Sequence, residues 1–346
     1  MRTLRERISK LNVSVLPDFF VDRIVSVPSI SKFFKQVESK AVSGGGNLRG
    51  LVHSEVLGGN AGNLAFALSS LSAKTTFYCV GNAITRAMIA MEPSSCKVRV
   101  IEGQPGYTTA LEFPLKGKRV NVMLSDSGDV ADFDGRKLTR KDIVNMKKSD
   151  CIAFVNWSAN RKGNELARKV FGRRGHSRRL NFIDPADLQG AENRIRTLVK
   201  DIVEKGLLDV ISLNENEAEI MMRVLLAGKL RRSYDSHDII KASRLLHDFL
   251  QTTVDVHTPI GSATSTNQGE TWSSSFRTVD GLVTGAGDVW DAGDIIGHLL
   301  NLEDEDRLRF ANACAYLYVR NRKTSYPTLR EVASFLGGRI AKSPGG

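Results

Sequence analysis

Short apolar runs alternate along the chain with stretches of helical pattern, and this alternation constrains the fold more than any other feature. Six runs predict strands: NVSVL (12–16), TTFYCV (75–80), CIAFV (151–155), LNFID (180–184), LDVISL (208–213) and TVDVH (253–257). Apolar residues recur every three or four positions between them, over 63–71, 162–171, 192–205, 216–227 and 237–250. Strands that are apolar on both faces and separated by helices predict a parallel sheet with helices on both sides, and therefore an α/β fold.

Two regions in the first third of the chain depart from this alternation. FFVDRIVSV (19–27) leads on to SGGGNLRGLVHSEV (43–56), and KVRVIE (97–102), YTTALEF (107–113) and KRVNVML (118–124) follow one another with no helical pattern between them. Such a succession of extended runs predicts a small antiparallel sheet. We therefore expect a β-sheet lid contributed by residues 18–57 and 97–125, within one domain that spans residues 1–346.

Composition excludes several classes of protein. Hydrophobic residues make up 41% and charged residues 25% of the chain, which are ordinary globular values and exclude wholesale disorder. No apolar run reaches the roughly 18 residues of a membrane-spanning helix, and the basic start leads into no cleavable apolar segment. The four cysteines form no CxxC pair, which favours a reducing compartment. We expect a soluble, cytoplasmic protein with no membrane partner.

The net charge is strongly positive. Lys and Arg number 49 against 38 Asp and Glu, which gives +11 and favours anionic partners such as nucleotides, sugar phosphates or nucleic acid. Basic residues concentrate between Arg161 and Arg179, where Phe171 is the one interleaved aromatic residue, and no nucleic-acid-binding motif accompanies them. We therefore favour a solvated basic surface over a nucleic-acid site.

The sequence TGAGDVWDAGD (284–294) is the strongest local motif. Gly285, Ala286 and Gly287 stand at the predicted start of a helix, where unpaired backbone N–H groups and the positive end of the helix dipole attract anions. Asp288 follows in the first turn, where a carboxylate beside a bound anion can accept a proton from an attacking hydroxyl. The alternative is a glycine-rich turn in which Asp288 is only a helix N-terminal carboxylate.

A second glycine motif, GGNAGN (58–63), precedes a predicted helix. Gly58 and Gly59 allow backbone conformations closed to other residues, and the amides of Asn60 and Asn63 offer donors and acceptors to a ligand. The motif lies well inside the chain and lacks the GxGxxG spacing of a dinucleotide-binding fold. A nicotinamide-dependent oxidoreductase is therefore disfavoured.

The sequence NENE (214–217) joins a predicted strand to a predicted helix. Amide and carboxylate oxygens from Asn214 and Glu217 at the carboxyl end of a strand suit a hydrated Mg2+. The alternative is equally consistent with the residues: Asn214 is the N-cap of the helix and Glu217, three residues on, completes the cap.

In this order along the chain, GGNAGN, NENE and TGAGDVWDAGD resemble the signature regions of the ribokinase family, also called the PfkB carbohydrate kinases. VDRIV (21–25), VGN (80–82), FANACAYLYV (310–319) and PTLREVASFLG (327–337) extend the resemblance over essentially the whole chain. The resemblance implies a ribokinase-like α/β/α sandwich with a central, mostly parallel sheet and a small β-sheet lid.

The resemblance also implies an activity, cofactors and site residues. It implies Mg2+-dependent transfer of the terminal phosphoryl group of ATP, or of ADP as in some relatives, to a hydroxyl of a sugar, sugar phosphate or nucleoside. Asp288 matches the general base, and the backbone N–H groups of Gly285, Ala286 and Gly287 match the anion hole. The other implied positions are Asp22, Gly58, Gly59 and Asn63 for the acceptor, Asn214, Thr258, Gly261 and Asn312 for the nucleotide, and Glu217, through water, for Mg2+. A homodimer through the lid is common in relatives.

Departures from the family pattern argue against a plain ribokinase. Leu282 stands where relatives have an Asp that helps to form a monovalent-cation site, and the nearest acid is Asp280, so dependence on potassium is left open. Phe19 and Phe20 stand where ribokinase-like members have smaller or polar residues. These two residues predict a more apolar acceptor pocket.

The acceptor is the least constrained part of the prediction. SGGGNLRG (43–50) predicts a lid loop in which Arg49 reaches a phosphate already present on the acceptor. The alternative is a solvated hairpin tip. Arg119 and Asn121, in the presumed lid sheet, are further candidates for contact with the acceptor. A phosphorylated sugar such as ribose 1-phosphate, or a nucleoside, is the preferred acceptor.

A catalytically silent ribokinase-like protein that binds a small molecule or nucleic acid is the competing interpretation. Loss of Asp288 or of the GAGD sequence would mark such a protein. Both are intact, so a kinase is favoured.

Overall fold

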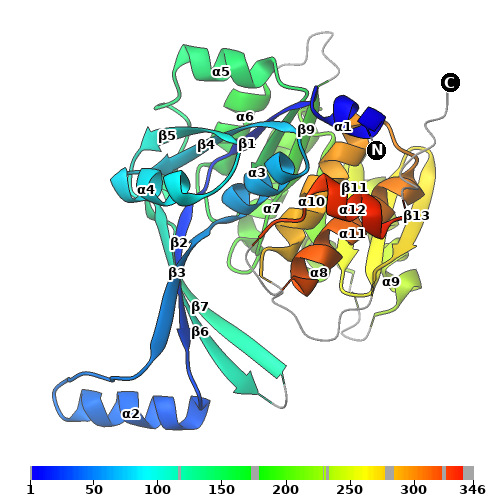
Figure 1. Cartoon of the computed structure of the whole chain (residues 1–346). Coiled ribbons are helices and arrows are strands. Elements are labelled where there is room, and N and C mark those ends of the chain that lie inside the picture. The colour runs from blue at the N-terminus through cyan, green and yellow to red at the C-terminus, as the bar shows by residue number, and fades with distance from the viewer. Residues whose placement is uncertain are drawn as a thin grey trace.

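The strands of the residues that the structure describes form two sheets, one with nine strands and one with four (Figure 1). The computed structural model describes residues 2–115, 118–172, 179–228, 230, 234–276, 284–321 and 325–337. Within these residues the larger sheet forms the body of the molecule, with helices on both faces, and the smaller sheet projects from the body as an arm (Figure 1). No helix among the described residues is long and apolar enough to cross a membrane.

The central sheet is parallel except at one edge. Its spatial order is β13 (Gly269–Ser274), β12 (Gly261–Thr266), β11 (Thr253–Thr258), β10 (Val210–Asn214), β9 (Leu180–Asp184), β8 (Cys151–Val155), β1 (Asn12–Leu16), β4 (Lys74–Gly81) and β5 (Lys97–Glu102). The strands from β11 to β5 pair in parallel, whereas β12 and β13 pair antiparallel. All six strands predicted from apolar runs lie in the parallel part. The α/β fold is confirmed.

The helices lie in two layers. One face of the sheet is covered by α1 (Arg2–Ile8), α3 (Asn60–Ser70), α10 (Ala286–Leu299), α11 (Asp304–Arg320) and α12 (Leu329–Phe335). The other is covered by α5 (Arg140–Lys147), α6 (Gly163–Phe171), α7 (Glu192–Leu198) with the π-helical turn η2 (Val199–Val203), α8 (Glu215–Leu226) and α9 (Ser236–Leu250). Alternate residues of each strand belong to these two hydrophobic layers, as period-two side-chain direction requires: Cys151 and Ala153 pack on one side, Ile152 and Phe154 on the other.

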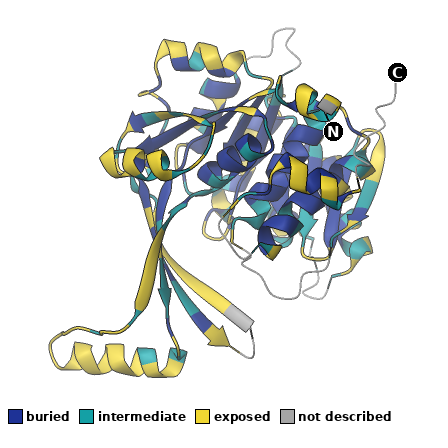
Figure 2. Ribbon diagram, viewed as in Figure 1, coloured by how far each residue is buried: buried dark blue, intermediate teal, exposed yellow. Residues whose placement is uncertain are grey.

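The smaller sheet is the lid. Its order is β3 (Val52–Gly58), β2 (Phe20–Ser26), β6 (Gly106–Leu115) and β7 (Lys118–Asp126), and the 3-10 turn η1 (Gly128–Asp132) follows it. The helix α2 (Ile30–Val42) connects β2 to β3 at the end of the lid far from the body (Figure 1). None of its residues is buried, and Figure 2 shows the helix exposed along its length.

The lid differs from the sequence prediction in three respects. Residues 97–102, expected in the lid, form β5, which pairs in parallel with β4 at the edge of the central sheet. The reason is α4 (Ala83–Met91), a crossover helix between β4 and β5 that the prediction missed. The lid sheet is mixed rather than antiparallel, because β2 and β6 run parallel. Residues 30–42 form a helix, so the lid strands come from 20–58 and 106–126.

Candidate active site

Asp288 lies at the start of α10, where two distant segments meet. Its side chain is buried and accepts hydrogen bonds at 2.8 Å from Asn60 Nδ2 and at 2.8 Å from Asn63 Nδ2, both in the first turn of α3. Burial raises the pKa of Asp288 well above its usual 3.8, the charge of Asp184 adds to the rise, and the two amides oppose it. The two glycine motifs of the sequence therefore form one site.

The turn before α10 requires glycine. Gly285 has φ +81°, a left-handed conformation, and a Cβ there would lie 3.0 Å from the Tyr318 hydroxyl oxygen. A Cβ at Gly287 would lie 3.0 Å from His257 Cε1. Glycine at these two positions lets the turn pack closely against Tyr318 and His257. The backbone N–H groups of the first turn of α10 have no partners within the helix.

Asp22 lies directly against the other glycine turn. In the lid, Asp22 on β2 pairs with Val56 on β3, and a Cβ at Gly58 would lie 2.1 Å from Asp22 Oδ2. Gly58 therefore leaves space for the carboxylate, and Gly59, at φ +92°, turns the chain into α3. Burial raises the pKa of Asp22 to about 6, against a hydrogen bond with Thr108 that lowers it.

Asp18 is a buried site residue that the sequence analysis missed. Its carboxylate follows β1, accepts a hydrogen bond from Ala61 N at 3.1 Å and another from Asn156 Nδ2 at 3.2 Å. Burial raises its pKa to about 6, and these hydrogen bonds only partly offset the rise. An acid immediately after a buried parallel strand was the available signal, because carboxyl ends of such strands form sites.

Tyr326 orients one of the two amides on Asp288. Its hydroxyl donates to Asn63 Oδ1 at 2.9 Å, which leaves Asn63 Nδ2 facing the carboxylate. The ring of Tyr326 stacks on that of Tyr318, with centroids 5.8 Å apart and 15° between planes. Tyr318 lies within the matched segment 310–319 but was not singled out there, and Tyr326 belongs to no predicted motif.

Two further buried acids lie beside Asp288. Asp184 ends β9 and accepts a hydrogen bond from Ala186 N at 2.7 Å, and Asp291 accepts one from Ser212 Oγ at 2.6 Å. Burial raises the pKa of both carboxyl groups, and the charge of Asp184 further raises that of Asp291. The sequence analysis named neither residue.

Asn214 and Glu217 form a helix cap. Asn214 Oδ1 accepts from Glu217 N at 3.0 Å, and Asn214 N donates to Glu217 Oε2 at 2.8 Å, which are the reciprocal bonds of a capping box. Glu217 is nevertheless buried and close enough to Asp184 to sense its charge. Burial and that charge together raise the pKa of Glu217 well above the usual value.

The remaining predicted nucleotide residues lie around β11 and β12. Thr258 Oγ1 accepts hydrogen bonds from Ile260 N and Gly261 N at 3.2 Å and so stabilises the turn between these strands. Asn312 is buried, and its side chain is already engaged: Oδ1 accepts from Trp290 Nε1 at 2.8 Å and Nδ2 donates to Ser273 O at 3.0 Å.

Arg49 is not brought to the site. It is exposed in the loop between α2 and β3, beyond Val52, and β3 runs from Val52 to Gly58. At roughly 3.3 Å per residue, this strand separates the loop from Gly58 by about 20 Å. The alternative stated above for residues 43–50, a solvated tip, therefore describes the position of Arg49. Asn121, in contrast, donates from Nδ2 to Thr284 Oγ1 at 3.1 Å, directly before the GAGD turn.

Several predicted features lie elsewhere or outside the described residues. Arg161 pairs with Asp132, and Arg168 lies 3.8 Å from Asp201, so this part of the basic segment faces acids. Residues 173–178, with Arg173, Arg174 and Arg178, and residues 277–283, with Asp280 and Leu282, lie outside the described residues, as does the Arg119 side chain. Arg179 is described, and its Nε donates to Asn181 Oδ1 at 3.1 Å.

A cavity of about 460 Å³ lies between the lid and the body. Asp22 from the lid, Asn63 from α3 and Thr284 beside the GAGD turn line its inner end. Phe19 and Phe20 are buried and do not line it, so the predicted source of its apolar character is wrong. The apolar lining comes instead from α4, the lid strands and the two stacked tyrosines.

Comparison with known proteins decides the family. The sequence pattern of the pfkB family of carbohydrate kinases matches residues 23–331. The chain belongs to the pfkB family. This pfkB kinase is therefore a phosphotransferase that acts on a hydroxyl group, and membership implies a nucleotide as phosphoryl donor. A search of curated proteins finds no significant match.

Solved structures confirm the fold. Ribokinase from Arabidopsis thaliana, complexed with ribose and ATP, is 17% identical, with a TM-score of 0.69 over 94% of this chain and 98% of that one. Adenosine kinase from Sinorhizobium meliloti is 16% identical, with a TM-score of 0.66 over 95% and 99%. Phosphofructokinase-2 from Escherichia coli, in complex with fructose-6-phosphate, is 13% identical, with a TM-score of 0.68 over 95% and 98%.

Proposed function

We propose that this pfkB kinase transfers the terminal phosphoryl group of ATP, or of ADP, to a hydroxyl of a sugar, sugar phosphate or nucleoside, with Asp288 as the general base. One observation carries the proposal. The Asp288 carboxylate is fixed by Asn60 and Asn63 at the N-terminus of α10, beside a turn with glycine at positions 285 and 287 and next to the inner end of the cavity. A base, an anion site and an acceptor pocket thus adjoin one another.

Each group has a distinct part in the proposed reaction. Asp22 accepts hydrogen bonds from acceptor hydroxyls and holds the reacting oxygen toward Asp288. Asp288 takes the proton of that hydroxyl as the oxygen attacks phosphorus. The backbone N–H groups of Gly285, Ala286 and Gly287 stabilise the charge on the phosphoryl oxygens in transit. Closure of the lid excludes water, which would otherwise compete as acceptor.

The donor set beside the nucleotide side of the site fits Mg2+. The side chains of Asp184, Asn214 and Glu217 offer carboxylate and amide oxygens. Burial raises the pKa of both acids, and the charge of Asp184 adds to the rise at Glu217. Hard oxygen ligands of this kind suit Mg2+ with its retained waters. We assign Asn214 and Glu217, acting through water, to hold the ion, which when bound neutralises charge on the nucleotide phosphates.

The raised pKa of Asp288 is consistent with its role as a base. Burial and Asp184 raise this pKa, so the carboxylate, once deprotonated, binds a proton more strongly than an exposed Asp does. Because the base must be deprotonated, kcat/KM should fall on acidification through an apparent pKa above the ordinary 3.8.

Substitution of the base tests the proposal. Asp288→Asn should lower kcat by about 10^2 to 10^4, with little change in nucleotide affinity, because the amide cannot accept the proton. The measurement is steady-state phosphoryl transfer with Mg-ATP and Mg-ADP over sugars, sugar phosphates and nucleosides, together with nucleotide binding by titration calorimetry. Asp306→Asn, the same change in the first turn of α11, is the matched control and should retain activity. Near-normal turnover in Asp288→Asn would remove Asp288 from this role.

We also propose a homodimer through the lid. The outer face of the lid exposes apolar side chains, among them Tyr107, Val122 and Leu124, with exposed fractions of 40%, 50% and 59%. An apolar sheet face of this kind is stable in water when a partner covers it. Light scattering on the purified protein should give the mass of two chains, and a monomer at micromolar concentration would contradict the proposal.

A further inference from the structure

The inner face of the lid has a polar row followed by an apolar row. Strand register places Val56, Asp22, Thr108 and Ser125 side by side across the sheet, and Thr108 Oγ1 lies 3.2 Å from Ser125 Oγ. Two residues farther from the body, the same register aligns Ser54, Ile24, Ala110 and Met123, and the three apolar members of this row line the cavity. At roughly 3.3 Å per residue, the apolar row begins about 7 Å beyond Asp22.

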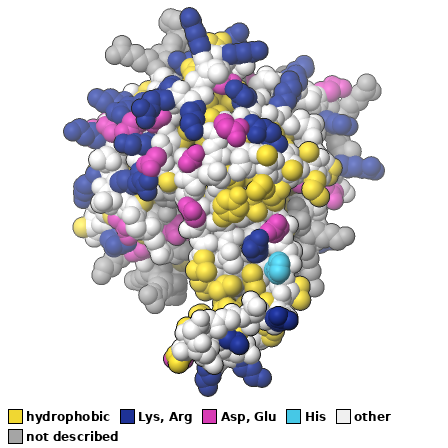
Figure 3. Space-filling view, turned by 90° about the vertical axis from the view of Figure 1, so that its left-hand side faces the viewer, with side chains coloured by type: hydrophobic (Ala, Val, Ile, Leu, Met, Phe, Trp, Pro, Cys, Tyr) yellow, Lys and Arg dark blue, Asp and Glu magenta, His cyan; other side chains and the backbone are white. Residues whose placement is uncertain are grey.

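The opposite wall of the cavity is apolar at the same level. Ile84, Met88 and Met91 recur at positions i, i+4 and i+7 of α4 and form one stripe that lines the cavity. Ile84 and Met91 are exposed by 49% and 84%. Figure 3, which views the face that carries α4 and β3, shows hydrophobic side chains gathered across its middle and lower part. Exposed methionines around a pocket are typical of a surface that an apolar ligand covers.

The charges of the cavity disfavour an anionic acceptor. The acidic side chains that line it are Asp22, Glu55, Glu92 and Glu112, and none of the described lining residues is Lys, Arg or His. Glu55 is paired with Arg23 at 2.5 Å. Asp22 on β2 and Glu92, directly after α4, place a carboxyl group on each wall of the cavity. A phosphate dianion in this cavity would meet carboxylates rather than the arginine or lysine groups that bind phosphates.

We propose that the acceptor is an uncharged molecule in which a hydroxylated ring carries a flat apolar group, as in a ribonucleoside, and that it carries no phosphate. The hydroxylated ring lies on the polar row at Asp22, with its reacting hydroxyl toward Asp288. The apolar group lies between Met123 of the lid and the α4 stripe. This inference rests on the proposed kinase function and narrows its acceptor from three classes to one.

A matched set of acceptors tests the inference. Phosphoryl transfer from Mg-ATP and Mg-ADP is measured with ribonucleosides, with free ribose, and with ribose 1-phosphate and ribose 5-phosphate. kcat/KM for the best ribonucleoside should exceed that for ribose by about 100-fold, because removal of an aromatic group costs about 3 kcal/mol of apolar contact. Ribose phosphates should be poorer than ribose. A ribose phosphate that exceeds every nucleoside overturns the inference and leaves the kinase function intact.

A charge placed in the apolar wall sharpens the test. Ile84→Lys should lower kcat/KM for the ribonucleoside by about tenfold, since it removes one apolar contact, and should raise the relative activity toward ribose phosphates. Ala87→Lys adds the same charge one turn away on α4, at an exposed position that does not line the cavity, and is the control. Equal effects of the two substitutions contradict the assignment of the stripe.

A binding measurement separates this inference from the kinase function. Asp288→Asn protein is titrated with the same acceptors in the presence of Mg-ADP. Nucleoside binding without binding of ribose phosphates supports the pocket assignment even if no transfer is found with the wild type. Absence of nucleoside binding, or tighter binding of a ribose phosphate, overturns it.

Discussion

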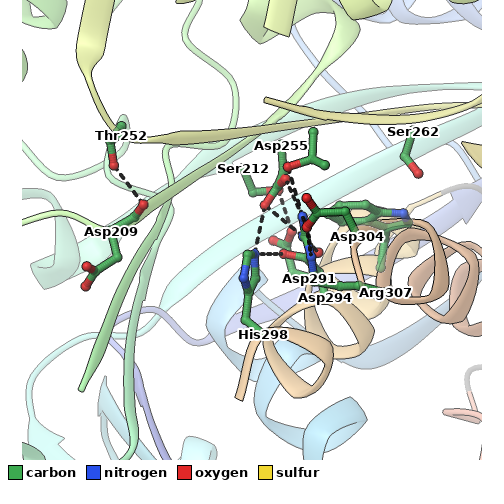
Figure 4. Close-up of polar contacts among 12 residues, drawn as sticks. Asp209, Ser212, Thr252, Asp255, Ser262, Asp291, Asp294, His298, Asp304 and Arg307 are labelled. Atoms are coloured by element: carbon green, nitrogen blue, oxygen red, sulfur yellow. Dashed lines mark hydrogen bonds and ion pairs between the residues drawn. The ribbon is translucent and has the colours of Figure 1, made fainter. Parts of the chain in front are cut away.

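Two groups of buried carboxylates lie in the body of this kinase, and they differ in their counter-charges. The Arg307 cluster consists of Asp255, Asp294, His298, Asp304 and Arg307, which β11, α10 and α11 bring together (Figure 4). The carboxylate cluster consists of Asp18, Asp184, Asp288 and Asp291, at the carboxyl ends of β1 and β9 and on α10. Both clusters are buried, but only the first contains cations.

The counter-charges determine the protonation of each cluster. Burial alone would raise the pKa of Asp255, but the Arg307 guanidinium at 3.2 Å and His298 at 3.1 Å lower it below its usual range. Burial keeps the pKa of Asp294 raised although Arg307 contacts it, because one guanidinium is shared among Asp255, Asp294 and Asp304. In the carboxylate cluster burial raises all four pKa values, and hydrogen bonds only moderate the rise.

The difference indicates which cluster is structural and which is functional. Arg307 on α11 pairs with Asp255 on β11 and with Asp294 on α10, so the counter-charge of this cluster comes from the fold itself. The four acids of the carboxylate cluster would be stabilised by a bound cation or by protonation, and the described part of the chain places no cationic side chain among them. Perturbed carboxyl groups of this kind concentrate at active sites, because a base needs an environment that would be unfavourable in a purely structural core.

Removal of the cation from the Arg307 cluster should have the largest effect. Arg307→Leu keeps side-chain bulk but leaves Asp255 and Asp294 buried with only His298 beside them, which should lower the free energy of unfolding by about 3 to 5 kcal/mol. Urea denaturation at pH 7.5 measures the change. Arg309→Leu, at an exposed position of the same helix, is the control and should change stability by less than about 0.5 kcal/mol.

A rescue variant distinguishes loss of charge balance from loss of packing. Adding Asp255→Asn and Asp294→Asn to Arg307→Leu removes the uncompensated charges and should recover most of the lost stability. If the triple variant is no more stable than Arg307→Leu, the cluster contributes through shape alone, and the contrast with the carboxylate cluster loses its basis.

The sequence predicted one side of this comparison better than the other. GAGD and GGNAGN are local patterns, so Asp288 and Asn63 could be named although 225 residues separate them. Asp18 and Tyr326 belong to no pattern, because burial beside a site depends on tertiary contacts such as the one between Tyr326 and Asn63, 263 residues apart. The burial of Arg307 could not be predicted either, because in the sequence it is one charged residue on an amphipathic helix.

The fold was predictable to the same extent. Parallel strands are continuous apolar runs, and all six predicted ones were found, because burial on both faces leaves a strong local signal. The lid was harder. Residues 97–102 alternate between exposed and half-buried positions, as an edge strand of the central sheet and a lid strand both do, so local pattern could not assign them.

Neutralisation of Asp18 should have a smaller effect of the opposite sign. Because burial raises its pKa from 3.8 to about 6, the folded state binds a proton more tightly than the unfolded state does. The stabilisation from that proton is complete below about pH 3.8 and is lost as the pH rises through about 6. At pH 7.5 the ionised Asp18 therefore destabilises the fold, and a difference of about two pH units corresponds to about 3 kcal/mol.

Asp18→Asn should accordingly raise the free energy of unfolding at pH 7.5 by about 1 to 3 kcal/mol, and the gain should shrink toward pH 4. The amide oxygen can still accept from Ala61 N, and the Asn156 amide can turn to accept from the new Nδ2. Urea denaturation at both pH values measures the gain, with the exposed Asp248→Asn as control. Activity should fall, because the charge of Asp18 helps to raise the pKa of Asp288. A variant that is less stable at pH 7.5 would show that the Asp18 carboxylate is compensated, as Asp255 is, and would erase the distinction between the two clusters.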